Sequence, residues 1–469
     1  MKNTIKYKTR ALYKMMVIGL LLLGFFFNGC EDFLETDDPL GQLPHEEVFS
    51  NEATATAAVT SLYGKLRDEV FLTGSISGMG VLMGMYSDEL DYYGYPGDTY
   101  ETFYLHNVLA ADPATQGIWD RAYGLVYMCN SVLEGLENAP ALASELKQQL
   151  RGETLFVRGL VHFYLVNLFG DIPYPTTTDY QSNSRISKEA IADVYDKIEM
   201  DLLEARALLS DGYPTGERIR ANSPAVSALL SRVYLYNEQW LEAEIESSKI
   251  IGNTSLYTLE TDLSQVFLKE STSAILQLKP QNEGSNTDEA ATYIFESPPP
   301  PFVALSPALV AAMEPNDMRL IEWIGEVSDG SQSWYYPNKY KEQFNTGTSM
   351  EYSIVFRLAE QYLIRAEARA NLNNVTGAQQ DLNVIRNRAG LENTPASTSE
   401  DLKLAILKER RFELFAEHGH RWFDLRRTGM ANEILGPIKS GWKATDVLLP
   451  IPESEILLNP NLEPQNPGY

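Results

Sequence analysis

Cysteine and basic residues are both scarce in this chain. It has two Cys among 469 residues, and its 38 Lys and Arg face 64 Asp and Glu, which gives a formal net charge of −26 at pH 7. Two cysteines exclude a disulfide-rich scaffold. Binding to nucleic acid or to an anionic membrane surface needs clustered Lys and Arg, and no basic run occurs beyond the N-terminus, so we expect neither.

Motifs of the common catalytic sites are absent as well. The chain contains no HExxH, no GxSxG, no phosphate-binding GxxxxGK and no CxxC, so we expect no enzyme activity and no cofactor. Of its five histidines, His418 and His420 lie close together. A zinc site would need further ligands, so we interpret this pair as structural. An acid-pair glycosidase stays open as an alternative, because it needs only two carboxylates about 5–9.5 Å apart.

The N-terminus has the composition of a secretion signal. Residues 1–14 carry five basic residues and no acid, and residues 15–27 are uncharged. The uncharged stretch is shorter than the ~20 residues that span a bilayer, which predicts a cleaved signal peptide over residues 1–29. It ends in Phe27-Asn28-Gly29-Cys30, which resembles a bacterial lipobox. We therefore predict lipid on Cys30, with simple secretion as the alternative, and a lipidated tether over residues 30–43.

Helical periodicity dominates the rest of the chain, residues 44–469. We predict helices over 118–137, 146–169, 188–209, 223–251 and 401–417. A capping box, Ser397-x-x-Glu400, precedes the last of them. The segments 225–251 and 357–388 look alike, as a helix, a short polar turn and a second helix, in the manner of tetratricopeptide hairpins that stack on one another. The alternative is that any helical protein contains such hairpins. Cys129 lies in an apolar helical pattern and is interpreted as a buried residue.

Two stretches interrupt the helices, at about 71–115 and 260–350. Both are rich in Tyr, Gly, Ser or Asn, and the second contains AILQL at 274–278, which predicts a short strand. Long irregular excursions on a rigid scaffold are where binding residues usually lie. We therefore expect the ligand site in these two excursions.

Aromatic residues gather in both excursions. Tyr and Trp present a flat apolar face with a polar rim, which suits the ring of a sugar. We interpret Trp334 and Tyr335 as exposed stacking surfaces, and Trp119, Trp240 and Trp422 as core. Asp88 lies with Glu89 and Asp91 beside the tyrosines; such acids could contact sugar hydroxyls or a structural calcium ion, or form a solvated loop. The predicted ligand-binding residues are Asp88, Tyr92, Tyr93, Tyr95, Trp334, Tyr335 and Tyr336.

Seven blocks of sequence, in order along the chain, are distinctive. They are CEDFLETDDP after the lipobox, IWDRAYGLVYMCNSVLEGL (118–136), LFVRGLVHFYLVNLFGDIPY (155–174), AVSALLSRVYLYNEQWLEAE (225–244), RLAEQYLIRAEARANL (357–372), ERRFELFAEHGHRWFDLRRTG (409–429) and the tail at 448–469. In these blocks the chain resembles the SusD/RagB family of Bacteroidetes outer-membrane lipoproteins, and the resemblance covers nearly the whole chain beyond the signal.

The resemblance implies a mostly α-helical fold, with about four tetratricopeptide-like units packed against a loop-rich region with a few short strands. It implies a non-enzymatic, lipid-anchored outer-membrane protein that faces the cell exterior and binds a glycan for a SusC-like TonB-dependent transporter. A minority of the family binds peptides, which is the alternative. A scaffold that binds only proteins is a further alternative. The segment 421–427 alternates rings with charges, and we interpret it as structural.

Overall fold

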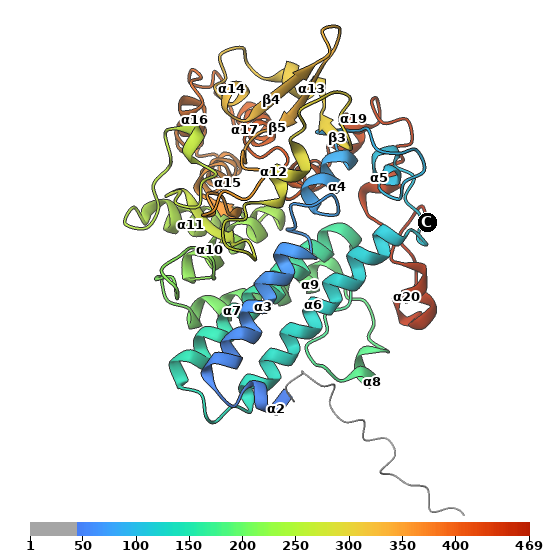
Figure 1. Ribbon diagram of the computed structural model, residues 1–469, viewed down its shortest axis with the longest axis vertical. Helices are drawn as coiled ribbons and strands as arrows, with labels where there is room; N and C mark the ends of the chain where they lie inside the picture. The colour runs from blue at the N-terminus through green and yellow to red at the C-terminus, as the bar shows by residue number, and fades with distance from the viewer. Residues whose placement is uncertain (1–44) are drawn as a thin grey trace, which may run out of the picture. The chain divides into compact units, whose positions relative to one another are not determined.

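Helices dominate residues 45–469, which are the residues that this computed structural model describes (Figure 1). The predicted signal peptide at 1–29, the tether at 30–43 and the lipidation site Cys30 lie outside the described residues. The short helix α2 (His45–Val48) belongs to an N-terminal unit that ends at Val48, and residues 49–469 form a second unit. The prediction of a mostly helical fold with a few short strands is confirmed.

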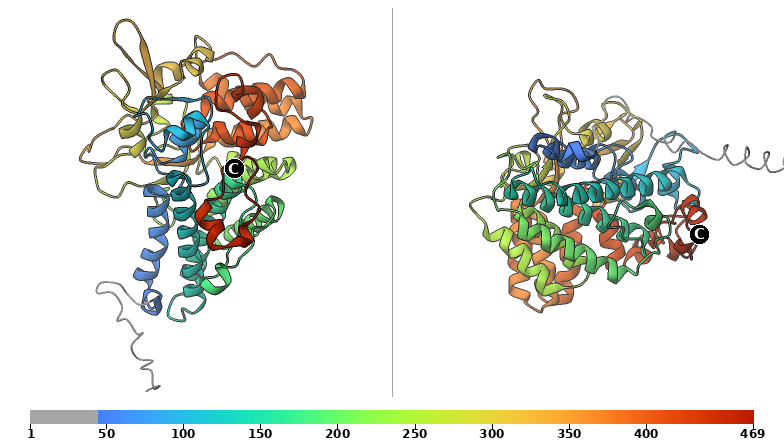
Figure 2. Two further views of the ribbon diagram at one scale, coloured as in Figure 1. Left: turned by 90° about the vertical axis from the view of Figure 1, so that its right-hand side faces the viewer. Right: turned by 90° about the horizontal axis from the view of Figure 1, so that it is seen from below.

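Antiparallel helices stacked side by side form the scaffold of the second unit (Figure 2). Neighbours in the chain are mostly neighbours in space, as short connections require. Predicted helices end within a few residues of the observed ones. The scaffold helices are α3 (Glu52–Asp68), α6 (Pro113–Glu137), α7 (Ser144–Phe169), α9 (Ile191–Leu208), α10 (Ser223–Tyr236), α11 (Trp240–Gly252), α15 (Leu358–Asn371), α16 (Val375–Arg388), α17 (Ser399–Glu413) and α18 (His420–Arg427).

The two similar segments do form matching hairpins. α10 and α11 are joined by a turn at 237–239, and α15 and α16 by a turn at 372–374. Each turn holds one non-glycine residue in the left-handed region, Glu238 at φ 57° and Asn373 at φ 60°. The same local geometry therefore reverses the chain in both hairpins, which supports the interpretation as repeats.

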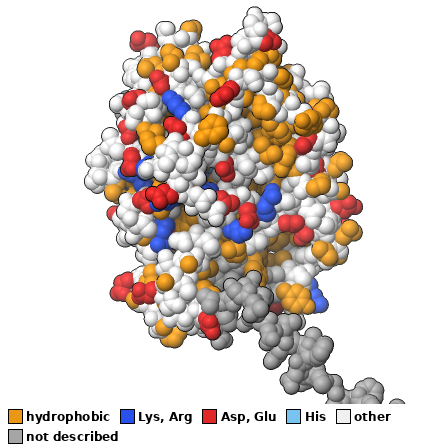
Figure 3. Space-filling view, viewed as in Figure 1, with side chains coloured by type: hydrophobic (Ala, Val, Ile, Leu, Met, Phe, Trp, Pro, Cys, Tyr) orange, Lys and Arg blue, Asp and Glu red, His pale blue; other side chains and the backbone are white. Residues whose placement is uncertain are grey.

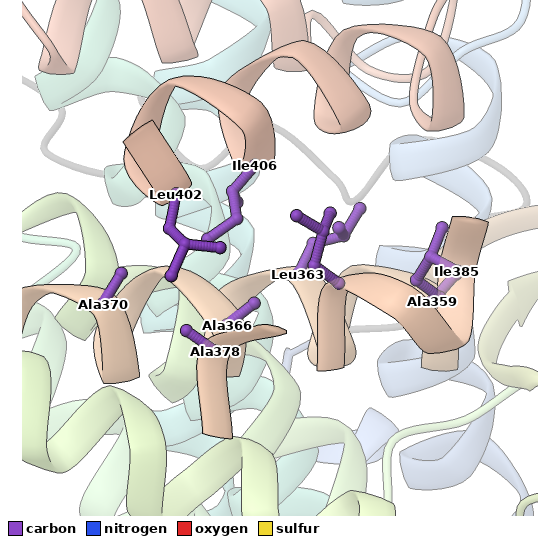
Figure 4. Packing of buried hydrophobic residues seen from close by; sticks show 9 residues of the cluster. Ala359, Leu363, Ala366, Ala370, Ala378, Ile385, Leu402 and Ile406 are labelled. Atoms are coloured by element: carbon purple, nitrogen blue, oxygen red, sulfur yellow. The ribbon is translucent and has the colours of Figure 1, made fainter. Parts of the chain in front are cut away.

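Small residues let the second hairpin pack closely against α17. Ala366 and Ala370 of α15 and Ala378 of α16 are fully or almost fully buried, and Figure 4 shows Leu402 and Ile406 of α17 pointing toward them. α17 begins one residue later than its predicted capping box. Its N-cap is Thr398, not Ser397: the Thr398 hydroxyl accepts the backbone N–H of Asp401 at 3.1 Å. The Thr398 hydroxyl also donates to the Asp401 carboxylate at 2.8 Å, so Thr398 and Asp401 take the place of the predicted Ser397 and Glu400.

Short strands and short helices make up the two excursions. β1 (Leu90–Tyr92), β3 (Val303–Leu305), β5 (Ser333–Pro337) and β4 (Ile324–Ser328) form one antiparallel sheet in that order, and β2 (Ala274–Leu278) pairs with β6 (Ser353–Arg357). The predicted strand at 274–278 is confirmed. The remaining short elements are α4 (Met79–Tyr86), α5 (Glu101–Leu105), α8 (Tyr180–Asn183), η3 (Leu263–Gln265), α12 (Asp288–Tyr293), α13 (Pro307–Ala312), α14 (Arg319–Glu322), α19 (Ala431–Leu435), η4 (Ala444–Val447), α20 (Glu453–Leu458) and η5 (Pro460–Leu462).

Candidate ligand-binding face

The four-stranded sheet brings the two excursions together. β1 comes from the first excursion and pairs with β3 of the second, with Tyr92 opposite Val303; β3 then pairs with β5, with Leu305 opposite Tyr335. Rings that are far apart in the sequence therefore share one sheet. We call the following residues the aromatic face: Tyr92, Tyr93, Tyr95, Tyr100, Tyr104, Phe302 and Tyr336. Figure 3 shows hydrophobic side chains gathered on this part of the surface, over β3, β5 and α5.

Phe302 and Tyr95 set the geometry of the outer part of the face. The Phe302 ring meets Tyr92 edge-on at 5.4 Å and Tyr100 at 6.0 Å. The Tyr92 hydroxyl donates to the carbonyl of Tyr95 at 2.9 Å, which ties the loop after β1 back to the strand. Tyr95 is 85% exposed, whereas Tyr92, Tyr100 and Phe302 are half-buried. Tyr95 thus offers a free ring beside rings that are held in place.

Trp334 does not lie exposed on this face, contrary to the prediction. It is 9% exposed and packs with Phe295 and Ala304, and Tyr93 and Tyr336 cover the cluster. Successive side chains of a strand point to opposite sides of the sheet, so Tyr335 leaves the sheet on the other side and is half-buried. Trp334 therefore supports Tyr93 and Tyr336 from below, and the prediction that it is a stacking surface is wrong.

Asp88 does not reach the face either. Its buried carboxylate accepts from Arg421 at 2.7 Å and pairs with Arg411 at 2.8 Å. Burial raises its pKa, but the two guanidinium groups outweigh burial and hold the pKa below its usual value. The neighbouring Glu89 is fully buried, and burial raises its pKa to about 8. Asp88 and Glu89 are therefore buried and do not form a solvated loop.

A polar group missed by the sequence analysis borders the face. Lys439 lies 3.9 Å from the centre of the Tyr104 ring and donates to the carbonyl of Met85 at 2.8 Å. Tyr104 donates to Asp91 at 3.3 Å. Burial lowers the pKa of Lys439 to about 8, although Asp91 attracts the proton. Asp91 and Lys439 thus supply an acceptor and a donor at the edge of the rings, which is how polar groups orient a sugar bound on an apolar surface.

The other aromatic, histidine and cysteine predictions mostly hold. Trp119 and Trp422 are buried, whereas Trp240, at the start of α11, is half-buried, so its assignment to the core is wrong. Cys129 is buried, and burial raises the pKa of its thiol to about 12. His418 and His420 are buried, and His418 Nε2 lies 2.8 Å from the carbonyl of Ile354. The structural interpretation of both histidines is therefore confirmed.

The segment that alternates rings with charges is structural. Arg421 holds Asp88, Arg427 pairs with Glu367 at 2.6 Å, and Asp424 accepts from Arg410 at 2.7 Å. Trp422 meets Tyr86 edge-on at 4.6 Å. All of these contacts are intramolecular and buried or partly buried, so this segment fixes the excursions to the scaffold.

Neither a cluster of metal ligands nor a membrane-spanning helix occurs among the described residues. No group of three or more His, Cys, Asp or Glu among residues 45–469 is arranged to hold a metal ion. Within the same residues, none of the helices combines the length and the hydropathy that crossing a bilayer requires.

Two family models match the chain. One, described as the SusD family, matches residues 324–469, and the other, described as "Starch-binding associating with outer membrane", matches residues 33–235. SusD-like protein P2 of Formosa agariphila is 26% identical over 97% of this chain and 99% of its own length. SusD-like protein P25 of the same organism is 25% identical over 97% of this chain and 99% of its own length.

Solved structures share the fold. A laminarin-binding SusD-like protein superposes with a TM-score of 0.77 at 25% identity, over 90% of this chain and 100% of its own. Surface glycan-binding protein A from Bacteroides fluxus superposes with a TM-score of 0.75 at 22% identity, over 90% of this chain and 100% of its own. The overall fold therefore recurs in known proteins.

Proposed function

The chain belongs to the SusD/RagB family, and on this premise we propose that it is a lipoprotein of the outer membrane that binds a glycan at the cell surface. It passes the oligosaccharide or polysaccharide to a SusC-like TonB-dependent transporter without changing its covalent bonds. The glycan binds on the aromatic face. The lipid on Cys30 holds the protein at the membrane, with the protein facing the cell exterior.

The observation that carries the proposal is the aromatic face itself. Two excursions supply half-exposed rings to one sheet, with Tyr95 free at its edge and Asp91 and Lys439 beside it. Flat rings accept the apolar side of a pyranose, and the polar pair contacts its hydroxyl groups. The laminarin-binding relative supports a glucan as the first ligand to test.

Isothermal titration of the purified protein tests the glycan. The panel holds laminarin, other neutral polysaccharides and a set of peptides. Tyr95→Ala should weaken glycan binding by roughly 1–3 kcal/mol, as loss of an aromatic contact does. Tyr180→Ala is the matched control, because Tyr180 is also exposed but lies on α8, away from the face. Binding to peptides and to no glycan would replace this proposal with the peptide-binding alternative.

The membrane and transporter parts need separate tests. Labelling of cells with a tagged palmitate should mark the wild-type protein and leave Cys30→Ala unmarked. Protease added to intact cells should cleave the protein if it faces outward. Co-purification from the native cells should recover a SusC-like barrel, and recovery of no barrel would remove the delivery step while leaving glycan binding intact.

A further inference from the structure

A groove lies on the scaffold, away from the aromatic face. Its volume is about 560 Å³, within the range of small-ligand sites. It is bounded by α6, by residues 173–177 and 183–186, and by α20, and these parts lie side by side in Figures 1 and 2. Tyr180 of α8 does not line it. None of the residues of the aromatic face lines it. The groove is therefore a separate cavity and not an extension of the first site.

Three rings of α6 form one wall. Trp119, Tyr123 and Tyr127 are spaced by four residues, so they lie in a row on one side of the helix. Trp119 is buried and lies 4.7 Å from Tyr123, which is half-buried, and Tyr127 is 54% exposed. The Tyr123 hydroxyl donates to the carbonyl of Pro173 at 2.9 Å, which fixes that ring. The row runs from a buried ring to an open one and offers a flat apolar surface along the groove.

Apolar side chains outside α6 also line the groove. Leu458 at the end of α20 is 78% exposed, and Pro173 and Pro175 lie in the lining as well. The tail after α20 is held in place, because Asn459 donates to the carbonyl of Ile186 at 2.8 Å. The groove therefore keeps its width without a partner, although an exposed leucine faces solvent beside it.

The ionisable groups that line the groove are all acids. Asp120 lies on α6 and Glu455 on α20. Burial and then the charge of Asp120 raise the pKa of Glu455, while a hydrogen bond from the Trp119 indole lowers it. Among residues 45–469, no Lys or Arg lines this groove. The side-chain amide of Asn183 donates to the carbonyl of Thr177 at 2.7 Å, which holds this part of the lining in place. The groove thus offers acceptors and apolar rings, and it suits a ligand that brings hydroxyl donors and no negative charge.

We propose that this groove is a second carbohydrate site, which takes a neutral pyranose unit. The apolar side of the ring lies on Tyr127 and Tyr123, and its hydroxyls donate to Asp120 and Glu455. The choice of sugar over other ligands rests on the proposed function. Uronic or sulfated sugars are excluded by the two acids. Two sites on one chain would hold a polysaccharide more tightly than either site alone, provided that one glycan reaches both.

Other occupants fit the charges less well. A second copy of this chain carries a net charge of −26, and the chain's own segment 31–43 is acidic, so both are repelled by Asp120 and Glu455. A neutral sugar meets no such repulsion.

Isothermal titration with short neutral oligosaccharides, namely laminari-, cello- and maltohexaose, tests the site. The wild-type protein should bind two equivalents of one of them. Tyr127→Ala and Asp120→Asn should each weaken one of these two by at least tenfold and leave the other unchanged. Tyr95→Ala should weaken the other binding event by at least tenfold and leave unchanged the one that Tyr127 and Asp120 control. An oligogalacturonide of the same length should not compete at the site that Tyr127 controls. Both groove residues are accessible at the surface, and circular dichroism checks that each variant is folded.

The outcomes separate this inference from the proposed function. One equivalent that Tyr95→Ala removes and both groove variants leave intact would overturn the second site and keep the first. No binding of any neutral oligosaccharide to the wild type would overturn both. A change in sedimentation coefficient with Tyr127→Ala, without a change in sugar binding, would mean that a second copy covers the groove and would also overturn the proposal.

Discussion

The side chains of the aromatic face and those of the charged segment 409–427 differ in how far they are buried and in whether they are paired. The segment buries its ions and pairs them: Glu413 contacts Arg319, Arg357 and Arg388. The face leaves rings half-exposed, and Tyr95 is almost free. A buried, paired charge fixes one arrangement, whereas a half-exposed ring keeps apolar surface available for a ligand.

The difference shows that segment 409–427, although it is easily recognised in the sequence, is structural, and that the proposed ligand-binding residues lie elsewhere. Segment 409–427 supplies no ring to the aromatic face, yet it holds both excursions. Arg421 and Arg411 hold Asp88 of the first excursion, and Glu417 pairs with Lys339 of the second at 2.5 Å. The excursions can therefore differ in their rings while their attachment to the scaffold stays the same.

The largest effect should follow from breaking the paired charges. Glu413→Gln removes the charge that three buried arginines share, and should cost roughly 3–5 kcal/mol in the free energy of unfolding, because uncompensated buried charge is expensive. Urea denaturation measures it. Glu400→Gln on the same helix is the control: Glu400 is 81% exposed, pairs with Lys403 at 2.6 Å, and should change stability by less than about 0.5 kcal/mol. Equal losses in the two variants would remove the contrast between the regions.

The next largest effect tests whether the Trp334 side chain stabilises the fold by packing or contacts the ligand. Its ring packs on Phe295 and Ala304, so Trp334→Ala should lower the free energy of unfolding by about 3 kcal/mol. Tyr95→Ala, an exposed ring in the same region, should leave stability unchanged and weaken glycan binding. Unchanged stability of Trp334→Ala, together with complete loss of glycan binding, would restore the sequence-based interpretation of Trp334 as a stacking surface.

Helix periodicity predicted the scaffold closely. The predicted helix at 146–169 is observed as Ser144–Phe169, and the one at 118–137 as Pro113–Glu137. Long amphipathic segments carry their own signal, because their apolar faces repeat every turn. The two matching hairpins were predicted for the same reason.

The details of the face could not be predicted, because they depend on distant partners. β1 and β3 are three residues each, too short for a pattern of alternating side chains. Asp88 and Arg421 are 333 positions apart, so the sequence near Asp88 gives no sign that it is paired. The excursions were predicted as the site, and the sheet places their rings together, but the burial of Trp334 and the position of Lys439 follow from tertiary contacts alone.

A pH experiment sharpens the comparison at Glu89, which lies between the two regions. Its pKa is raised from 4.5 to about 8 in the folded chain, chiefly by burial. Between these values the native state holds a proton that the unfolded state has lost, so stability should fall as pH rises from about 4.5 to 8. Glu89→Gln is neutral throughout, so it should lose less stability than the wild type between pH 5 and pH 8, by roughly 1–3 kcal/mol. Urea denaturation at both values measures this.

Glu400→Gln serves again as the control, since it alters an exposed acid and should follow the wild-type pH profile. Parallel profiles for Glu89→Gln and the wild type would mean that Glu89 is charged in the folded protein and that its environment is less apolar than its burial indicates.

The smallest effect concerns how the free ring is held. The Tyr92 hydroxyl donates to the carbonyl of Tyr95 at 2.9 Å in an exposed setting. Tyr92→Phe keeps the Tyr92 ring against Phe302 and removes only this hydrogen bond, so the free energy of unfolding should stay within about 0.5 kcal/mol of the wild type. Glycan binding should weaken by about 0.5–1 kcal/mol, because the ligand must then order the loop. Tyr180→Phe is the control for both measurements. A loss as large as that of Tyr95→Ala would show that the face depends on fixed geometry as strongly as segment 409–427 does, and the contrast between the two regions would then be one of exposure and not of rigidity.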